Sequence, residues 1–366
     1  MKITDVTLQN FLWERDKSIR NGKYTYTHST LFLLNIHTDE GITGIGFGLS
    51  SSSGMMNVAN GLLEYFKPVL IGKDPFNYRR IWDELWQPKL VGRRGITTRF
   101  ISWVDIAVWD VIGKKTGKSL HKLLGGFRDR VPAYIAGGYY GEGKGLDGLV
   151  AEMEENISLG AKAIKMKIGG VSIREDVDRV RVVRETIGDD VKLMVDANCA
   201  YSVREAITIA QKMERYDLFW FEEPISVDDY RGHQRLAQST TIPIATGENE
   251  YTRYGFRDLI AHDAAAIYNA DAQILGGITE FMQVAALVAS HDLHIAPHGD
   301  QEIHIHLVGA IPHGLIVEFY RETVDENRGN IFEEKMQLEH DGYITIPDRP
   351  GLGITPNFDF LKKYSV

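Results

Sequence analysis

The stretch AIKMKIGGVSIREDVDRVRVVRETIGDDVKLMVDANC, residues 163–199, joins two short β-rich runs through a segment of helical periodicity. The runs are AIKMKIG (163–169) and KLMVDANC (192–199), and the amphipathic segment REDVDRVRVVRETIG (174–188) lies between them. Two strands joined by a helix usually pair in parallel within one sheet. The stretch therefore predicts one strand–helix–strand unit of a parallel sheet.

The same alternation extends outward from this unit over residues 131–320. The predicted strands cover residues 131–138, 163–169, 192–199, 218–224, 243–249, 266–273, 293–299 and 315–320. The predicted helices cover residues 149–161, 174–188, 203–216, 231–240 and 278–292. Evenly spaced strands alternating with helices favour a closed (β/α) barrel over an open doubly wound sheet. No glycine fingerprint follows the first strand, so a dinucleotide site is not indicated.

The first 130 residues follow a different pattern, which predicts an α+β domain before the barrel. Three β-rich runs (2–11, 29–38 and 41–48) precede two helical segments (59–72 and 97–117). Two polar segments, 15–29 and 48–57, are long for connections, and long polar loops are often functional lids. We expect domains at residues 1–130 and 131–344, with an extended tail, about 345–366, that packs back on the first domain.

Composition narrows the range of partners. The chain has 366 residues, 43% hydrophobic and 25% charged, and its formal net charge of -9 argues against nucleic acid or an anionic membrane as the main partner. Cys199 is the only cysteine, so no internal disulfide can form. The N-terminal MKITDVTLQNF alternates like a strand and lacks the apolar run of a signal peptide. We therefore expect a cytoplasmic protein.

Ionisable residues recur at the carboxyl ends of the predicted barrel strands, which meet at one rim of a barrel. In strand order these residues are Lys165 and Lys167, Asp196 with Asn198, Glu222, Glu248, Asp271, His298 and Glu318. Each alone has a structural explanation, because paired glutamates before a proline or a histidine in a loop are common. Their repetition at the same end of successive strands is what predicts an active site.

Three of these carboxylates, Asp196, Glu222 and Glu248, come from neighbouring strands and would repel one another without a cation. Oxygen ligands without cysteine or histidine suit a hard ion, so Mg²⁺ is the first choice and Mn²⁺ the second. Strand parity favours Glu222 over Glu223 as the inward residue. The sequence alone leaves the choice between these two glutamates open.

Several motifs occur together in the chain: KMK (165–167), DAN (196–198), EEP (222–224) and GEN (247–249), with Asp271, His298, Glu318 and the segment 102–126. In these features the chain resembles the enolase superfamily, mandelate racemase subgroup. The resemblance implies an α+β capping domain, a modified (β/α)₇β barrel and lids at 15–29 and 48–57. It also implies a homo-oligomer. For the site, it implies that a protonated Glu318 donates a hydrogen bond to an enediolate, and that Asn198 contacts the substrate near its α-hydroxyl.

The two lysines and the histidine predict acid–base chemistry at a carbon beside a carboxylate. Lys165 and Lys167 share one strand face, and close ammonium groups lower each other's pKa, so Lys167 is predicted to be the base. His298 is predicted to lie across the barrel from Lys167. Asp271 is predicted to orient and support its imidazole.

These features together predict a Mg²⁺-dependent dehydratase of a sugar acid, an aldonate or aldarate. Lys167 would take the C2 proton, His298 would protonate the departing 3-hydroxyl, and the product would be a 2-keto-3-deoxy acid. Tyr26 and Tyr139 are predicted to bind the substrate. The polar residues of the first lid and its neighbourhood offer further hydrogen bonds; they are Arg15, Arg20, Lys23, Tyr24, His28 and Tyr140.

Two alternatives stay open at this point. The same lysine–histidine site could racemise or epimerise C2, or act as a cycloisomerase on a sugar acid or lactone. A sugar-acid binding protein on a catalytically inactive barrel is the third possibility, and intact acid, base and metal positions argue against it. No role can be assigned to Asp300 from the sequence.

Overall fold

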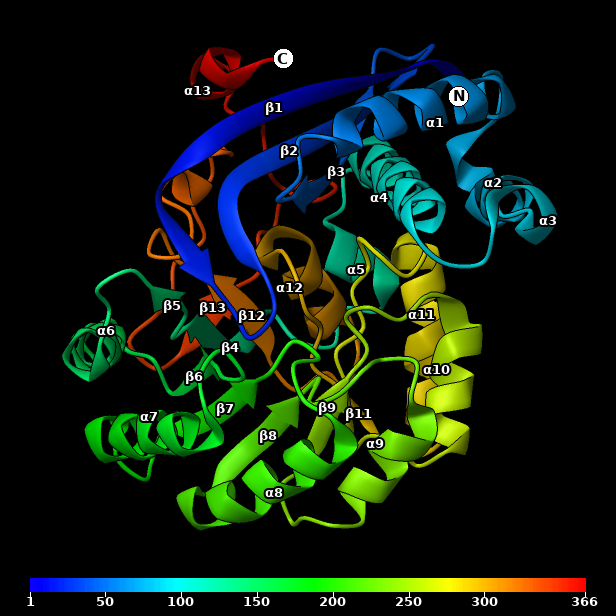
Figure 1. Ribbon diagram of the computed structural model, residues 1–366. Helices are drawn as coiled ribbons and strands as arrows, with labels where there is room; N and C mark the ends of the chain where they lie inside the picture. The colour runs from blue at the N-terminus through cyan, green and yellow to red at the C-terminus, as the bar shows by residue number, and fades with distance from the viewer.

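The computed structural model describes residues 1–366, apart from the side chain of Val91. An antiparallel sheet built mainly from the N-terminal strands forms an arch, and the parallel strands lie below it (Figure 1). The strands of the antiparallel sheet, in spatial order, are β3 (Thr43–Ser50), β2 (Thr25–Thr38), β1 (Ile3–Arg20) and β5 (Tyr140–Gly141). The helices that follow strand β3 in the sequence are α1 (Met55–Leu70), α2 (Tyr78–Leu85), α3 (Pro88–Val91), α4 (Ile96–Thr116) and α5 (Leu120–Leu124).

The parallel strands form a barrel whose strands follow the order of the sequence. They are β4 (Arg130–Gly137), β6 (Ala163–Lys167), β7 (Lys192–Asp196), β8 (Leu218–Glu222), β9 (Ile244–Thr246), β10 (Ile267–Tyr268), β11 (His294–Ile295) and β12 (Val317–Tyr320). The intervening helices are α6 (Leu146–Ser158), α7 (Ile173–Ile187), α8 (Val203–Met213), α9 (Tyr230–Ala237), α10 (Thr252–Ala261), α11 (Gly277–Ala289) and α12 (Gln301–Ala310). Short 3₁₀ helices lie at Pro75–Asn77, Glu214–Tyr216, Arg328–Asn330 and Lys362–Tyr364.

The last strand, β12, closes the barrel. It pairs in parallel with β4, and a parallel bridge between Ile295 and Gly314 connects its approach to β11. Each barrel strand before β12 leads through a helix to the next strand, and no helix of the described chain follows β12 directly. The predicted fold class, an antiparallel capping region followed by a modified (β/α)₇β barrel, is confirmed. Among the described helices, none combines the length and apolar composition that a membrane crossing requires.

Two barrel helices were not predicted from the sequence. Helix α10 was missed because it is only 10 residues long and Gly255, a poor helix former, lies in its buried face. Helix α12 is buried along its whole length, so it lacks the polar stripe that reveals an amphipathic helix. Its alternating IHIH segment, residues 303–306, also resembles a strand.

The predicted polar loop at residues 15–29 is wrong. Strand β1 continues to Arg20 and β2 starts at Thr25, so most of this segment forms a hairpin, with Ile19 opposite Tyr26. Alternating tyrosine and threonine residues favour strand structure, which explains the difference. The hairpin tip pairs with β5, where Ile19 lies opposite Gly141, so the tip is tied to the barrel. The other predicted loop, 48–57, is shorter than expected, because β3 ends at Ser50 and α1 begins at Met55.

The C-terminal tail contacts both parts of the molecule. Strand β13 (Tyr343–Thr345) pairs with β4 of the barrel, which the sequence did not indicate. Farther on, Leu361 of α13 (Phe358–Leu361) joins the core that contains Phe11, and the Val366 N–H donates to the Asn10 carbonyl at 3.1 Å. The chain end therefore lies beside β1 (Figure 1). The expected packing on the first sheet is present, whereas the exact domain boundaries stay a prediction.

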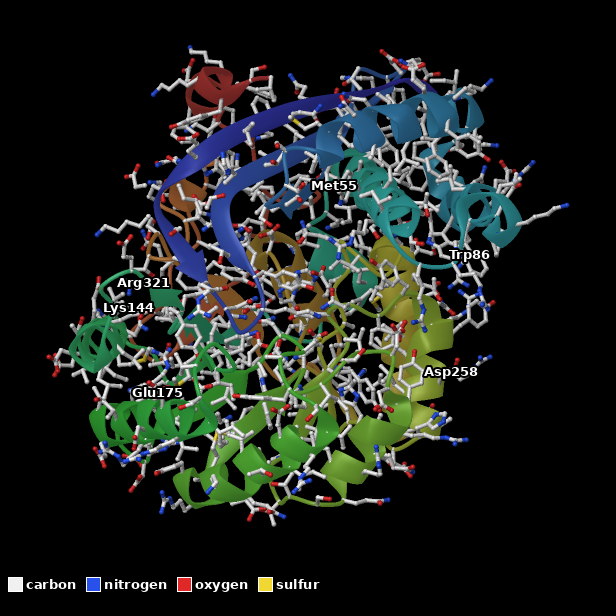
Figure 2. The ribbon with its side chains drawn as sticks, in the orientation of Figure 1. Met55, Trp86, Lys144, Glu175, Asp258 and Arg321 are labelled. Atoms are coloured by element: carbon white, nitrogen blue, oxygen red, sulfur yellow. The ribbon has the colours of Figure 1, made fainter. Side chains whose placement is uncertain are left out.

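One hydrophobic core joins the first sheet and its helices to α10 and α11 of the barrel. A second core lies between the strands and the helices α6 to α9. Charged side chains such as Glu175 of α7 and Asp258 of α10 lie at the periphery (Figure 2). The capping sheet is thus held to the barrel by continuous apolar packing, which fixes its position over the carboxyl ends of the strands.

Three glycines on one face of β3 let α4 lie directly on the sheet. Gly44, Gly46 and Gly48 alternate along the strand, so they share the face toward α4. A Cβ atom at Gly46 would lie 1.9 Å from the Trp103 carbonyl oxygen, and one at Gly44 would lie 2.3 Å from that of Ala107. The helix backbone therefore occupies the space that side chains would need.

We expect Gly46→Ala to destabilise the protein by about 3 kcal/mol, because the new methyl group forces α4 away from β3. Gly61→Ala is the matched control, since Gly61 lies within α1 and a Cβ there meets nothing within 4 Å. It should stabilise the helix by up to about 1 kcal/mol. Urea unfolding midpoints measure both changes. Equal midpoints for the two variants would contradict the proposed close packing.

Candidate active site

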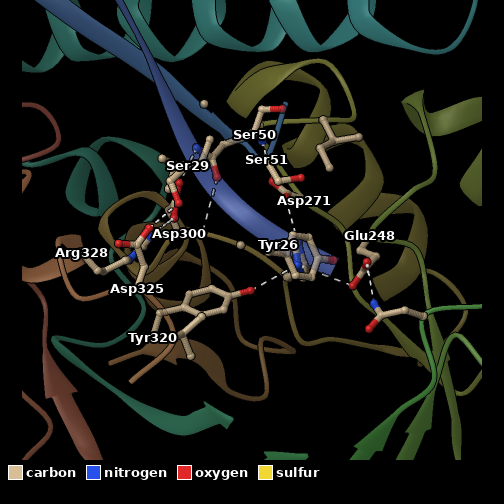
Figure 3. A pocket seen from close by; sticks show the side chains of 18 of the residues that line it. Tyr26, Ser29, Ser50, Ser51, Glu248, Asp271, Asp300, Tyr320, Asp325 and Arg328 are labelled. Carbon is tan, nitrogen blue, oxygen red and sulfur yellow. Dashed lines mark hydrogen bonds and ion pairs between the residues drawn. The ribbon is translucent and has the colours of Figure 1, made fainter. Parts of the chain in front are cut away.

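A cavity of about 330 Å³ lies between the carboxyl ends of the barrel strands and the capping region. Its lining side chains come from both parts of the chain: Tyr26, Ser50 and Ser51 belong to the capping region and Glu248, Asp271 and Tyr320 to the barrel, and Figure 3 shows these six residues close together. Further lining residues are Arg15, Ser29, Arg99, Tyr139, Lys167, Asn198, Asn249, Gln273, His298, Asp300, Asp325 and Arg328. Apolar side chains also line the cavity, among them Leu49, Trp103 and Ile274, and the β1–β2 hairpin covers one side of it.

Three buried carboxylates converge at the carboxyl ends of neighbouring barrel strands, and one of them, Glu248, lines the cavity. Asp196 ends β7, Glu222 ends β8 beside it in register, and Glu248 follows β9. One oxygen from each lies within 4.8 Å of the others. Burial raises the pKa of Glu222 to about 8; Lys165 opposes this rise, whereas Asp196 and Glu248 add to it. The predicted convergence of the three carboxylates is present, and their mutual repulsion calls for a positive charge.

The donor set fits a hard divalent cation. All three side chains offer oxygen atoms, which Mg²⁺ prefers. The Oε2 atom of Glu248 is buried and has no hydrogen-bond partner among the described residues. A buried carboxylate oxygen without a partner is costly, and a cation would satisfy it. Asp196, Glu222 and Glu248 could therefore hold a magnesium ion.

Glu223 points away from the three carboxylates. Its backbone has a positive φ of 36°, a left-handed conformation at the point where the chain leaves the strand. The Asn249 side-chain amide donates to both its carboxylate oxygens, at 3.0 and 3.1 Å, and the Cys199 thiol donates at 3.3 Å. This geometry agrees with the strand-parity argument that favoured Glu222.

Two buried lysines balance these charges. Lys165 donates to the two oxygens of Glu222 at 2.9 and 3.0 Å and lies 2.9 Å from Oε1 of Glu318. Lys167 donates to Oδ2 of Asp196. Both ammonium groups project from the same face of β6, as the spacing of two predicted.

The expected low pKa of Lys167 is wrong for the charges present in this structure. Burial acts to lower the pKa of Lys167 and Lys165 adds to that effect, in the predicted direction. Asp196, together with Tyr139 and Glu248, outweighs both and raises the pKa of Lys167 well above its usual value. A cation bound by Asp196 would compete with Lys167 for the same negative charge and would oppose this increase.

His298 and Asp271 form the predicted pair on another side of the cavity. Nδ1 of His298 lies 2.9 Å from Oδ2 of Asp271, and Nε2 lies 3.6 Å from Oε2 of Glu248. Burial acts to lower the pKa of His298, but Glu248, Glu318 and Asp271 together raise it to about 10. The imidazole is therefore positively charged at neutral pH.

Glu318 differs from its predicted state. It was expected to be protonated, but its contacts are those of a carboxylate. Burial acts to raise its pKa, whereas the positive charges of Lys165 and His298 lower it below the usual range. The Gly299 N–H also donates to its Oε2 atom at 3.1 Å. Glu318 therefore accepts hydrogen bonds in this structure and has no proton to donate.

The residues predicted to bind substrate line the cavity. Asn198 lies beside Glu248, with 3.5 Å between its amide nitrogen and Oε1. The centre of the Tyr139 ring lies 5.2 Å from Nζ of Lys167. The ring of Tyr26 packs edge-on against the ring of Tyr139, with 6.4 Å between the ring centres. Their contacts with a substrate stay predictions.

Several other polar residues expected near the substrate lie elsewhere. The hydroxyl group of Tyr140 donates to Asp176, and Arg20 donates to the Gly170 carbonyl at 2.9 Å. Neither residue lines the cavity, nor do Lys23, Tyr24 and His28. Lys23 and Tyr24 lie at the tip of the hairpin, between β1 and β2, and Tyr140 lies on β5, positions that a loop prediction could not give.

Several cavity residues were missed, among them Tyr320, Gln273, Arg328 and Asp325. Tyr320 and Gln273 each lie two positions after a predicted site residue, Glu318 and Asp271, so the rule of alternating faces could have found them. Arg328 and Asp325 follow the last strand in a segment without periodicity, which gives no signal. Arg328 forms an ion pair with Asp300, and Gln273 donates to Asp300 at 2.8 Å, so the unassigned Asp300 lies within this polar wall.

Comparison with known proteins identifies the family. Residues 148–360 match the family described as "Enolase C-terminal domain-like". Residues 3–125 match the family described as "Mandelate racemase / muconate lactonizing enzyme, N-terminal domain". The chain belongs to the mandelate racemase and muconate lactonizing enzyme family of the enolase superfamily. The resemblance inferred from the motifs is confirmed.

Named relatives span nearly the whole chain. Arabinonate dehydratase from Saccharolobus solfataricus is 36% identical over 336 residues, which cover 90% of this chain and 89% of that protein. The 3,6-anhydro-alpha-L-galactonate cycloisomerase from Streptomyces coelicolor is 34% identical over 337 residues, covering 92% and 91%. L-Talarate dehydratase from a Polaromonas species, solved with Mg and L-glucarate, has a TM-score of 0.90 and 34% identity and covers 100% of this chain and 97% of its own.

These relatives establish that the protein is an enzyme of this family. Dehydratases and cycloisomerases occur among them, and a related structure contains magnesium. The three carboxylates of this chain offer the matching oxygen donors. Which reaction this enzyme catalyses is considered below.

We expect Glu222→Gln to weaken Mg²⁺ binding more than Glu223→Gln does. Only Glu222 belongs to the converging carboxylates, whereas Glu223 accepts hydrogen bonds from Asn249 and Cys199. Isothermal titration calorimetry with MgCl₂ measures both affinities. If Glu223→Gln proves the more damaging variant, Glu222 is not the metal ligand on β8.

Proposed function

We propose that the enzyme is a magnesium-dependent dehydratase that converts an aldonate or aldarate into a 2-keto-3-deoxy acid. One observation carries this proposal. Lys167 and His298 contact different members of the same carboxylate cluster, Asp196 and Glu248 respectively. A substrate carboxylate above that cluster would have a base candidate on one side and an acid candidate on the other.

Lys167 is the proposed base. As a free amine, Lys167 would take the proton from C2. Asp196, Glu222 and Glu248 would hold the cation, which would offset the charge of Asp196 and so oppose the high pKa of Lys167. Loss of that proton places a second negative charge on the substrate, in an enediolate. Mg²⁺, when bound, supplies the positive charge that stabilises this anion. Lys165 lies 2.9 Å from Glu222 and adds a fixed positive charge to the same region.

His298 is the proposed acid. The charged imidazole is oriented by Asp271 through Nδ1, which leaves Nε2 to face the cavity. Nε2 would deliver its proton to the 3-hydroxyl as the C3–O bond breaks, releasing water and forming an enol. The enol then tautomerises to the keto acid. Asn198 and Tyr139 are the proposed contacts for the remaining substrate oxygens.

A sugar acid suits the cavity better than an aromatic acid. The lining is rich in hydrogen-bonding groups, including Ser50, Ser51, Arg99 and Gln273. Relatives that cover most of the chain are named for arabinonate and for talarate and galactarate. These two facts support the substrate class, and neither selects a chain length or a configuration.

Cycloisomerisation or inversion at C2 is the second candidate. A relative with 34% identity is a cycloisomerase, and the same two groups could serve either reaction. The two outcomes differ in whether the C3–O bond of an open-chain sugar acid is lost as water. The oligomeric state expected from the family stays a prediction.

The proposal is tested with C4–C6 aldonates and aldarates, each incubated with the enzyme and Mg²⁺. We expect at least one to give a 2-keto-3-deoxy acid, measured with semicarbazide. Lys167→Ala should abolish this activity while keeping Mg²⁺ affinity, because the base is lost and the carboxylates remain. Lys192→Ala, at the opposite end of a barrel strand, is the control and should retain activity. Near-normal turnover by Lys167→Ala would exclude Lys167 as the base.

We expect His298→Asn to separate proton removal from dehydration. Asparagine keeps a hydrogen-bonding group but cannot deliver a proton, so little keto acid should form. In D₂O the variant should still exchange the C2 hydrogen with retained configuration, because Lys167 returns deuterium to the same face. NMR of the recovered substrate measures this exchange. Wild-type enzyme that yields only C2-inverted substrate across the panel would instead identify an epimerase.

A further inference from the structure

Tyr320 places its hydroxyl group against the catalytic histidine candidate. It lies on β12, two residues after Glu318, so both side chains project to the inside of the barrel. Its oxygen is 3.3 Å from Nε2 of His298. Figure 3 shows the phenol reaching across the cavity toward the side occupied by Glu248, with Asp271 nearby.

The nitrogen that Tyr320 contacts is the one available for chemistry. Nδ1 of His298 is held by Asp271 at 2.9 Å, so Nε2 faces the cavity. Around Nε2, the nearest oxygens of Glu248 and Glu318 lie at 3.6 and 3.9 Å, beyond normal hydrogen-bond length. Among the described residues, the phenol is therefore the hydrogen-bond partner of Nε2.

The phenol is held firmly in this position. The Arg328 guanidinium carbon lies 5.1 Å from the centre of its ring, within cation–π range. Arg328 is fixed in turn by Asp300 and by Glu302, the latter at 3.1 Å. Arg328 also donates to the Gln301 side chain at 3.0 Å. The buried ion pairs behind the ring thus restrict its rotation.

We propose that Tyr320 is a positioning residue for the proton-transfer step of His298. This inference rests on the proposed function, in which His298 Nε2 gives its proton to the departing oxygen. A phenol can accept a hydrogen bond and can also donate one. It accepts from the charged imidazole before transfer and donates to the neutral Nε2 afterwards. A carboxylate could only accept, so it would stabilise the charged ring alone.

The proton balance is simple. The C3–O bond breaks, the Nε2 proton joins the departing oxygen as water, and the enediolate electrons form the C2–C3 double bond. Tyr320 keeps its own proton throughout. The hydroxyl therefore affects the step that uses His298 and leaves the step that uses Lys167 untouched.

Tyr320→Phe tests the proposal, because it removes the hydroxyl and keeps the ring against Arg328. We expect keto-acid formation to fall on the order of tenfold, the loss of one hydrogen bond to a charged group. Exchange of the C2 hydrogen with retained configuration should not change. Tyr268→Phe is the matched control, because Tyr268 lies on β10 with a buried hydroxyl that has no partner among the described residues. Tyr268→Phe should change neither the rate of keto-acid formation nor the rate of C2-hydrogen exchange.

Two results would overturn the inference. If exchange and dehydration fall together in Tyr320→Phe, the residue only maintains the structure. If neither falls, the hydrogen bond has no role in the reaction. Should wild type prove to be an epimerase, the proposed function fails but the inference is still tested. His298 would then protonate the opposite face of C2, and Tyr320→Phe should slow inversion while sparing retained exchange.

A direct measurement needs no substrate. In histidine-labelled protein, the ¹⁵N resonance of His298 Nε2 should shift in Tyr320→Phe and stay in place in Tyr268→Phe. An unchanged resonance in Tyr320→Phe would show that the contact is absent in solution, and the inference would fail on that ground alone.

Discussion

Repulsion among three buried carboxylates is the constraint on which this structure depends. Parallel pairing brings Asp196 level with Glu222 at the ends of β7 and β8, and Glu248 follows from the next strand. Buried charges persist only when they are paired. Lys165 and Lys167 pair with Glu222 and Asp196, whereas Oε2 of Glu248 lies 3.6 Å from Nε2 of His298 and accepts no hydrogen bond from the described residues. The site is thus built for a cation that the protein itself does not provide.

The capping region completes the site from above. The β1–β2 hairpin carries Tyr26 into the cavity, and its tip is tied to the barrel through β5. Arg15 from the same hairpin donates to the Val324 carbonyl beyond the last barrel strand. These contacts and the shared hydrophobic core hold the cover in place. The hairpin covers part of the cavity, and partial exclusion of water strengthens electrostatic interactions inside it.

The two sides of the cavity have different electrostatic characters. Lys167 lies against a carboxylate of the metal cluster, so its proton affinity depends on what else binds Asp196. His298 is backed by Asp271 and lies near Glu248 and Glu318, which keep it charged. Lys167, the proposed base, is paired with a carboxylate of the cluster, and His298, the proposed acid, is paired with Asp271, which lies outside the cluster. This asymmetry matches the requirements of a base and an acid in one elimination.

The sequence by itself determined the barrel and the identity of the charged residues at its rim. Strand–helix alternation and a spacing of two place Lys165, Lys167, Asp196 and Asn198 correctly, because these patterns follow from local backbone geometry. Local patterns could not give the hairpin at 15–29, the buried helix α12 or the tail strand β13, which depend on distant partners. Nor could they give the ionised state of Glu318 or the high pKa of Lys167, since these follow from neighbours brought together only by folding. Tertiary structure alone brought Arg328 and Asp325 to the cavity wall, because they follow the last strand in a segment without periodicity and their positions depend on contacts with distant parts of the chain.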